Sequence, residues 1–239
     1  MVFGQRAPFD FSPPTIWDAG TGAGHTAFFL IRKYPCARLL GTDLDSEMIR
    51  RCRVIAARTQ NARVEFCEED LVQTARRPEY DLVICFEVLE HIEDYDTAVH
   101  NLSSSLSAGG ILIIHTPAKG RFNGEEGGRF GLRRFGEKPP SPVSREKGQY
   151  HVHPGFEIGQ LEECLTRHGL MVERSEFTFG VLAMFAHTIY EKTRSRSLCM
   201  LLSFPFLMLM GLIDWFLHRK EGGGILVVAR KPNVIPDCQ

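Results

Sequence analysis

The sequence has no excess of charge of either sign. It contains 28 Lys and Arg against 29 Asp and Glu in 239 residues, a formal net charge of -1. This balance excludes a chain that binds nucleic acid through its overall charge, so we expect no nucleic-acid partner unless a local patch supplies one. With 44% hydrophobic residues, the composition also excludes a disordered or fibrous chain and suffices for the core of one medium-sized domain.

The 7 cysteines include no C-x-x-C pair, and residues 1–14 lack the basic and then apolar stretches of a secretory leader. Cys67 and Cys85 fall within apolar runs that read as strands. Buried, reduced thiols are therefore expected, and with them a cytoplasmic protein.

What the sequence does have, near its start, is a strand, a glycine-rich turn and a helix. The strand ends at about Trp17, Gly20, Gly22 and Gly24 alternate after it, and the helix begins within 26–31. Glycine permits a positive φ and close approach of a ligand, and the helix N-terminus offers free N–H groups. The third glycine comes one residue too early for the dinucleotide motif G-x-G-x-x-G. Both a ligand-binding turn and a purely connecting turn fit this pattern.

Acidic residues follow the next two predicted strands. Asp43 ends the strand 37–43, where a carboxylate can accept hydrogen bonds from both hydroxyls of a ribose. Asp70 follows the short strand 64–67 and could accept a hydrogen bond from an adenine amine. The alternatives are capping of the next helix, which Asp45 begins, and a plain loop acid at Asp70.

Strands and helices alternate along the rest of the chain, which predicts an α/β fold: a doubly wound, seven-stranded, mostly parallel sheet in a single domain over 1–239. Further strands are expected at 80–86, 111–115, 171–179 and 224–230, and helices at 47–58, from Asp94 or Asp96 to Leu106, and at 157–168. Gly109 and Gly110 are expected to separate the middle helix from its following strand.

Together, the segments 18–24, 41–45, 69–70 and 86–91 resemble the class I S-adenosylmethionine-dependent methyltransferases, especially the branch of the ubiquinone-pathway O-methyltransferases. The resemblance covers residues 14–178 and resumes at 224–232. It implies a Rossmann-like fold, methyltransferase activity and S-adenosylmethionine as cofactor. Carried over by position, it implies a cofactor site formed by Asp18, Gly20, Thr21, Gly22, Gly24, Asp43, Leu44, Met48, Asp70, Leu71 and Phe86. In this set the glycines contact the methionine part, Asp43 the ribose and Asp70 the adenine.

Methyl transfer from a sulfonium is an in-line displacement, so the enzyme has to align the acceptor and exclude water. A hydroxyl acceptor also needs a base. The candidates are His91, His115, His151, His153 and Glu87, with His151 and His153 preferred because they follow the fifth strand in a loop that binds substrate in this family. Packed or solvent-facing histidines are the alternative.

The same region could hold a metal ion. Helical spacing would place Glu87, Glu90 and His91 on one face, and His151 or His153 could add a ligand for Mg²⁺ or a transition metal. That arrangement would favour a metal-dependent O-methyltransferase acting on RNA or a catechol. A site with a metal ion and a site without one both fit this pattern.

Two segments lie outside the common core. Residues 119–148 are rich in Gly, Pro and basic residues and predict a flexible loop. Residues 181–222 predict a hydrophobic helical insertion, within which 197–217 is long enough to span a bilayer. A crossing would separate the last strand from its sheet, so we expect a hairpin broken at Pro205 or a helix lying in the membrane interface. A buried cap or a homodimer contact is the competing interpretation.

These observations predict O-methylation of a small-molecule or lipid-linked hydroxyl substrate, by a protein peripheral to the inner face of a membrane. The alternative is a non-catalytic module that binds the cofactor or is recruited to membranes as a scaffold.

Overall fold

The computed structural model describes residues 13–59, 63–119, 151–180, 182–183, 185–186, 189–190, 197–216 and 221–233. Apart from Lys119, the predicted basic loop at 119–148 lies outside the described residues.

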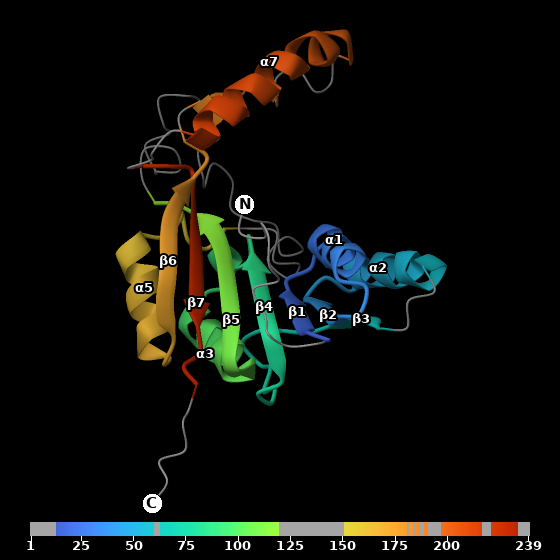
Figure 1. Cartoon of the computed structure of the whole chain (residues 1–239), viewed down its shortest axis with the longest axis vertical. Coiled ribbons are helices and arrows are strands. Elements are labelled where there is room, and N and C mark those ends of the chain that lie inside the picture. Colours follow the sequence, from blue (N-terminus) through green and yellow to red (C-terminus); the bar gives the residue numbers. More distant parts are fainter. Residues whose placement is uncertain are drawn as a thin grey trace, which may run out of the picture.

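The core of the molecule is a seven-stranded sheet with the strand order β3-β2-β1-β4-β5-β7-β6 (Figure 1). The first five strands of the chain pair in parallel, and β7 runs antiparallel to both β5 and β6. The predicted doubly wound, mostly parallel α/β fold is therefore confirmed. The strands are β1 (Thr15–Ala19), β2 (Arg38–Asp43), β3 (Val64–Glu68), β4 (Tyr80–Phe86), β5 (Leu106–Pro117), β6 (Met171–Thr178) and β7 (Gly224–Arg230).

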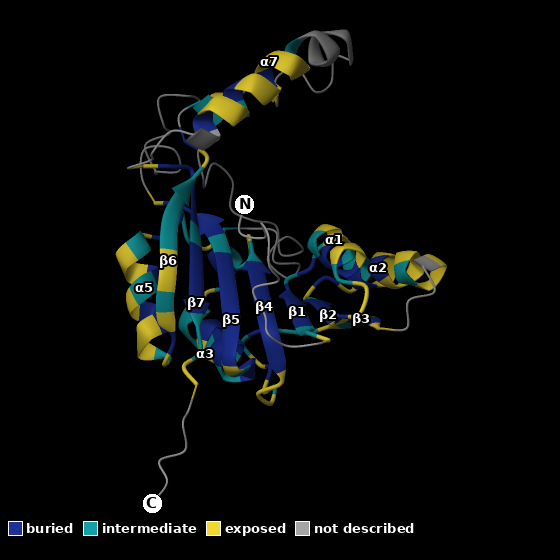
Figure 2. Ribbon diagram, in the orientation of Figure 1, coloured by how far each residue is buried: buried dark blue, intermediate teal, exposed yellow. Residues whose placement is uncertain are grey.

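Helices cover both faces of this sheet. The covering helices are α1 (His25–Lys33), α2 (Ser46–Thr59), the short 3-10 helix η1 (Leu89–His91), α3 (Tyr95–Ser105) and α5 (Ile158–Arg167). The helix α7 (Ser197–Phe216) lies outside these layers. In β4, Leu82 and Ile84 pack in the core with α1 and α2, whereas Val83 and Cys85 pack in the core with α3 and α5. Because both faces are covered, the central strands are mostly apolar and are buried along almost their whole length (Figure 2).

Asp94, one of the two predicted caps, begins α3 by accepting a hydrogen bond from the backbone N–H of Thr97. The predicted start of the next strand is wrong, because β5 already begins at Leu106. Gly109 has a φ of 76° and the pairing with β4 shifts register opposite this stretch, so the two glycines form an irregularity inside the strand.

Of the two predicted arrangements, the hairpin broken at Pro205 is wrong, because α7 continues through this residue as one helix, and the single interfacial helix stays a prediction. Proline removes one backbone hydrogen bond, but the Leu, Met and Phe residues on both sides are compatible with helix. Figure 1 shows α7 standing apart from the sheet, beyond the carboxyl ends of β4 and β5. None of the helices in the described part of the chain combines the length and hydropathy that a membrane crossing requires.

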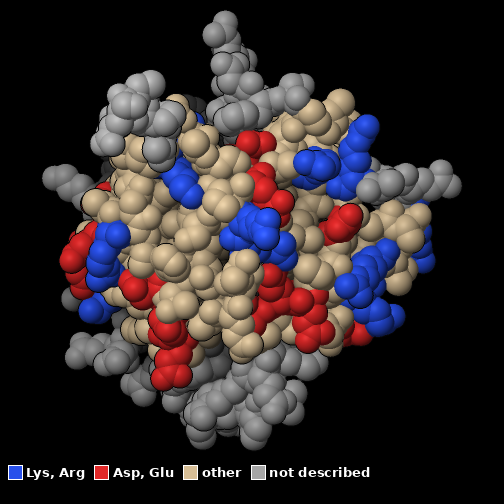
Figure 3. Space-filling model, turned by 90° about the horizontal axis from the view of Figure 1, so that it is seen from below, with Lys and Arg blue, Asp and Glu red and all other residues tan. Residues whose placement is uncertain are grey.

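A buried carboxylate joins α7 to the segment that follows β6. Asp214, which is 2% exposed, accepts hydrogen bonds from the backbone N–H groups of Gly180 at 2.9 Å and Leu182 at 3.2 Å. Leu207 and Met210 pack with Ala186 on the same side of the helix. The end of the molecule opposite α7 carries Lys and Arg interspersed with Asp and Glu, so this face offers no patch of one sign (Figure 3).

Candidate functional site

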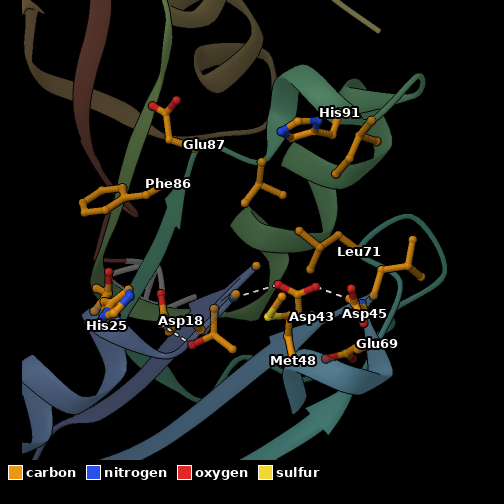
Figure 4. Close-up of a pocket in the computed structure, with 18 of the residues that line it drawn as sticks. Asp18, His25, Asp43, Asp45, Met48, Glu69, Leu71, Phe86, Glu87 and His91 are labelled. Atoms are coloured by element: carbon orange, nitrogen blue, oxygen red, sulfur yellow. Dashed lines mark hydrogen bonds between the residues drawn. The ribbon is translucent and has the colours of Figure 1, made fainter. Parts of the chain in front are cut away.

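A cavity of about 500 Å³ lies beyond the carboxyl ends of β1, β2, β3 and β4 (Figure 4). Ligands bind at this edge of open α/β sheets. All the predicted cofactor-binding residues except Gly24 line it: Asp18, Gly20, Thr21, Gly22, Asp43, Leu44, Met48, Asp70, Leu71 and Phe86. Of the predicted catalytic residues, Glu87 and His91 line the cavity, and His151 and His153 do not.

The three glycines of the first turn have different surroundings. Gly20 has a φ of 80°, and a Cβ there would lie 2.2 Å from Cγ2 of Val88. Gly22 has a φ of 52° with nothing within 4 Å of an added Cβ, so its backbone is open to the cavity. Gly24 instead begins α1, where a Cβ would meet Phe28. Its absence from the lining reflects this packing against α1.

Asp18 lies beneath the turn and is 3% exposed. Its Oδ2 accepts a hydrogen bond from the hydroxyl of Thr21 at 2.6 Å. Burial, with a smaller contribution from the nearby charge of Asp43, raises the pKa of Asp18 to about 6. A positively charged group in the cavity would therefore favour the ionised form of this carboxyl.

Asp43 connects the glycine turn to the loop that follows β2. Its Oδ2 accepts from the N–H of Gly22 at 2.7 Å and its Oδ1 from the N–H of Asp45 at 2.9 Å. Asp45 in turn accepts from the N–H of Glu47, so the capping role falls to Asp45. An ionised carboxylate has about four acceptor positions. Asp43 therefore keeps capacity for two further donors, such as a pair of hydroxyls.

Asp70 stabilises the turn after β3. Its Oδ1 accepts from the N–H of Val72 at 2.9 Å and its Oδ2 from the side-chain amide of Gln73 at 3.0 Å. Near it, Met48 and Leu71 form apolar parts of the wall (Figure 4). The carboxylate is a turn acid that still has acceptor positions left.

Comparison with known proteins bears on this geometry. Residues 17–112 match a family profile described as a methyltransferase domain. A trans-aconitate 2-methyltransferase from Azoarcus sp. (strain BH72) is 28% identical over 193 residues, which cover 81% of this chain and 71% of the relative. A malonyl-[acyl-carrier protein] O-methyltransferase from Acetivibrio thermocellus is 31% identical over 42% of this chain and 35% of its own length.

A solved structure shares the fold of most of this chain. Phosphoethanolamine N-methyltransferase 2 from Haemonchus contortus, in complex with S-adenosyl-L-methionine, superposes with a TM-score of 0.62 at 18% identity. The match covers 92% of this chain and 49% of that chain. Residues 17–112 are therefore similar to a methyltransferase domain, and the chain has the Rossmann-like fold of methyltransferases. The superposed neighbour binds S-adenosyl-L-methionine.

The lining of the cavity fits S-adenosylmethionine. Six carboxylates line it, and among the described lining residues there is no Lys or Arg, which suits a ligand that carries a sulfonium and an ammonium group. The acids are Asp18, Asp43, Asp45, Glu69, Asp70 and Glu87. The open backbone at Gly22 and the two remaining acceptor positions of Asp43 provide space and hydrogen-bond acceptors for its polar parts.

Beyond Phe86, a chain of polar side chains begins at the cavity. Glu87 has a positive φ of 56°, and its Oε1 lies 2.5 Å from Nδ1 of His115, while Nε2 of His115 lies 2.7 Å from the hydroxyl of Thr178. Phe179, also with a positive φ of 53°, packs its ring edge-on to that of His115. Such strained residues cluster at functional sites.

Sequence reasoning named His115 only as one base among several and missed Thr178 and Phe179. The sequence feature that could have predicted the pair of Glu87 and His115 is the parallel register of β4 and β5. Phe86 on β4 lies directly beside His115 on β5. Thr178 ends β6, and no spacing along the chain predicts its approach.

The predicted metal ligands separate into two groups. Glu90, His91 and His151 place ligand atoms within 4.8 Å of one another. Glu87 does not join them, because its positive φ sets it outside the 3-10 helix and its carboxylate pairs with His115. The expectation that Glu87 shares a helical face with Glu90 is therefore wrong.

His153 also lies apart from that cluster. Its Nε2 is 3.0 Å from the carbonyl oxygen of Ile92, and its ring packs edge-on to Tyr95. The N–H groups of Val152 and His153 both donate to the carbonyl of Glu90, which places His151 edge-on to the ring of His91 at 4.6 Å between centroids. Burial lowers the pKa of His151.

Proposed function

We propose that the domain transfers a methyl group from S-adenosylmethionine to an oxygen atom of a small-molecule or lipid-linked hydroxyl substrate. The observation that carries this proposal is the position of Glu87, which lines the cofactor cavity and is held by His115. The match to a protein named as an O-methyltransferase supports oxygen as the acceptor. The more specific resemblance to the ubiquinone-pathway branch stays a prediction.

In this proposal the cofactor lies along the cavity. Gly20 and Gly22 flank its methionine part, Asp18 receives its amino group, and Asp43 accepts from the ribose hydroxyls. Asp70 accepts from the adenine amine, between apolar walls formed by Leu44, Met48 and Leu71, and Phe86 adjoins the reacting end. When bound, the cofactor supplies a methyl group activated by positively charged sulfur. Thr21 holds Asp18 in place.

The chain's own contribution to the chemistry is alignment and proton removal. Glu87 keeps its Oε1 on His115, and in this proposal its Oε2 accepts the hydrogen bond of the acceptor hydroxyl. As the acceptor oxygen attacks in line, its proton passes to the Glu87–His115 pair, and Thr178 fixes the orientation of the imidazole from the other side. His91, which lines the same cavity, is the second candidate base, with His151 behind it.

A second candidate function is metal-dependent O-methylation, as on RNA or a catechol. One observation favours it: Glu90 is 0% exposed, and its Oε1 forms no hydrogen bond with any described residue, while lying 3.9 Å from Nε2 of His91. A divalent cation bound by Glu90, His91 and His151 would satisfy this oxygen and could orient an acceptor oxygen.

A membrane-surface location is part of the proposal. On α7, six large apolar side chains are between 45% and 59% exposed: Phe204, Phe206, Met208, Leu209, Leu212 and Ile213. A helix with this much exposed apolar surface suits the boundary between lipid headgroups and acyl chains. A homodimer contact through the same helix is the competing arrangement.

The proposal is tested by incubating the full chain with methyl-labelled S-adenosylmethionine and fractionated metabolite and lipid extracts. We expect labelled product from one fraction, and a fall in kcat of about 10²- to 10⁴-fold in Glu87→Gln with cofactor affinity unchanged. Glu65→Gln, which alters an exposed carboxylate on β3, is the matched control. Loss of activity with a chelator and its return with a divalent cation would support the metal-dependent candidate instead. Cofactor binding without product from any fraction would leave the non-catalytic module as the function.

A further inference from the structure

A second cluster of metal-ligating side chains lies outside the cofactor cavity, between α3 and α5. These two helices pack on the same face of the sheet, in one hydrophobic core. Asp96 lies in the first turn of α3, Cys164 lies within α5, and His168 forms the C-terminal cap of α5. The proposed methyl transfer uses none of these residues.

The two oxygens of Asp96 lie at distances from His168 and Cys164 that are close to those between ligands of one metal ion. Oδ2 of Asp96 lies 3.3 Å from Nε2 of His168, and Oδ1 of Asp96 lies 3.4 Å from Sγ of Cys164. One ligand atom from each residue falls within 4.8 Å of the others. Tetrahedral zinc, with bonds of about 2.0 to 2.3 Å, separates neighbouring ligand atoms by about 3.3 to 3.6 Å.

Burial supports the same assignment. Cys164 is 1% exposed, and the Nε2 atom of His168 is shielded from solvent. Despite its distance of 3.3 Å from Asp96, this nitrogen makes no well-formed hydrogen bond with any described residue. A buried imidazole nitrogen facing a thiol and a carboxylate is suited to accept a metal ion, since the ion satisfies all three groups at once.

A fourth ligand is available one helical turn from Asp96. Asp96 and His100 are separated by four residues on α3, as are Cys164 and His168 along α5, so each pair lies on one helix face. The rings of His100 and His168 lie 5.3 Å apart between centroids. His100 is exposed.

We propose that a zinc-type transition-metal ion joins α3 to α5, bound by Asp96, Cys164 and His168 with His100 in the fourth position. Sulfur and nitrogen ligands select such an ion over Mg²⁺ or Ca²⁺. The thiol proton of Cys164 passes to solvent as the metal–sulfur bond forms. Arg167, which lies 2.6 Å from Oδ1 of Asp96, forms an exposed ion pair with it, and such a pair holds its partners only weakly.

The test is a Co²⁺ titration of the reduced full chain, followed by absorption spectroscopy. We expect the visible bands of tetrahedral cobalt together with a thiolate-to-cobalt charge-transfer band, and loss of both when Zn²⁺ is added. Cys164→Ser, His168→Gln and Asp96→Asn should remove or weaken these bands. Cys36→Ser, at an exposed cysteine, and His151→Gln, in the sulfur-free cluster beside the cavity, should keep them.

Circular dichroism shows which variants fold. If the core substitution at Cys164 prevents folding, the Asp96→Asn variant, at a partly exposed residue, is compared with the wild type instead. Absence of a charge-transfer band in the reduced wild-type chain would overturn the proposal. So would a band that persists unchanged in a folded Cys164→Ser or Asp96→Asn variant.

Discussion

Gly20 and Gly22 both have a positive φ, but only one of them is crowded. The space beside Gly20 is filled by Val88, whereas the space beside Gly22 is open to the cavity. A methyl group added at Gly20 therefore affects mainly the stability of the fold, and one added at Gly22 affects mainly ligand binding.

We predict that Gly20→Ala lowers the free energy of unfolding by about 1 to 3 kcal/mol through its clash with Val88, in addition to about 1 kcal/mol of backbone strain. In Gly20→Ala combined with Val88→Ala, the stability lost to the clash should be regained, whereas the stability lost to backbone strain should not. Urea denaturation of the two single variants and the double variant measures this coupling. Additive effects would contradict the contact.

Gly22→Ala is the matched comparison. It carries the same type of backbone strain without a clash, and its methyl group occupies part of the cavity. We predict a larger loss of S-adenosylmethionine affinity than in Gly20→Ala with Val88→Ala, measured by calorimetry. Equal affinities in the two backgrounds would argue against cofactor placement on this turn.

At the residue scale, the sequence predicted the acids of the cavity better than its bases. Asp43 and Asp70 follow from strand ends, because parallel strands bring their carboxyl ends to one edge, whereas Asp18 was implied by the family resemblance. The pairing of Glu87 with His115 depends on a positive φ that the sequence does not reveal. His151 reaches His91 only because two backbone hydrogen bonds to Glu90 hold its loop.

Among the elements, boundaries were predictable where the apolar pattern is continuous. The predicted strand 80–86 is β4, since a strand buried on both faces has an uninterrupted apolar run between polar ends. The same reasoning failed for α7, where proline was weighed as a breaker although apolar helix-forming residues continue on both sides.

The exposed side of α7 leads to a prediction about vesicle binding. We replace Phe206, Leu209 and Leu212 with Ser. Each replacement should lower the partition coefficient for anionic lipid vesicles, measured by sedimentation, by about tenfold or more, because each inserted apolar side chain contributes about 1.5 to 3 kcal/mol. Phe29→Ser, at a side chain on α1 that is 55% exposed, is the control and should bind like the wild type.

Two results would contradict a membrane role for α7. One is equal sedimentation of the triple variant and the wild type. The other is a wild-type chain that ignores vesicles but elutes as a dimer, which the same three substitutions convert to a monomer.

For the molecule as a whole, the buried Asp18 makes stability depend on pH in an unusual direction. Its pKa is raised from 3.8 to about 6 by burial, so the folded chain binds this proton more tightly than the unfolded chain does. The stabilisation from this group is present below about pH 4 and is lost as the pH rises through about 6. Asp43, Cys52 and Cys85 are the titratable groups that interact with it.

We therefore predict that Asp18→Asn, which stays uncharged, loses less stability between pH 4 and 7 than the wild type, by an amount on the order of 2 to 3 kcal/mol. Thermal and urea unfolding without cofactor measure the difference. Glu65→Gln should follow the wild-type profile. Parallel profiles for Asp18→Asn and the wild type would show that Asp18 is ionised across this range.

The position of β7 has a consequence for the order in which the chain can fold. β6 has no partner in the sheet other than β7, and β7 is synthesised only after the whole of α7. During synthesis β6 therefore stays unpaired until β7 has left the ribosome. The apolar helix α7 leaves the ribosome before β7 does. Closing such a long loop is slow, and the waiting intermediate exposes both a strand edge and apolar surface. Early capture of α7 by a lipid surface or a chaperone would protect the nascent chain at the stage when it is most prone to aggregate.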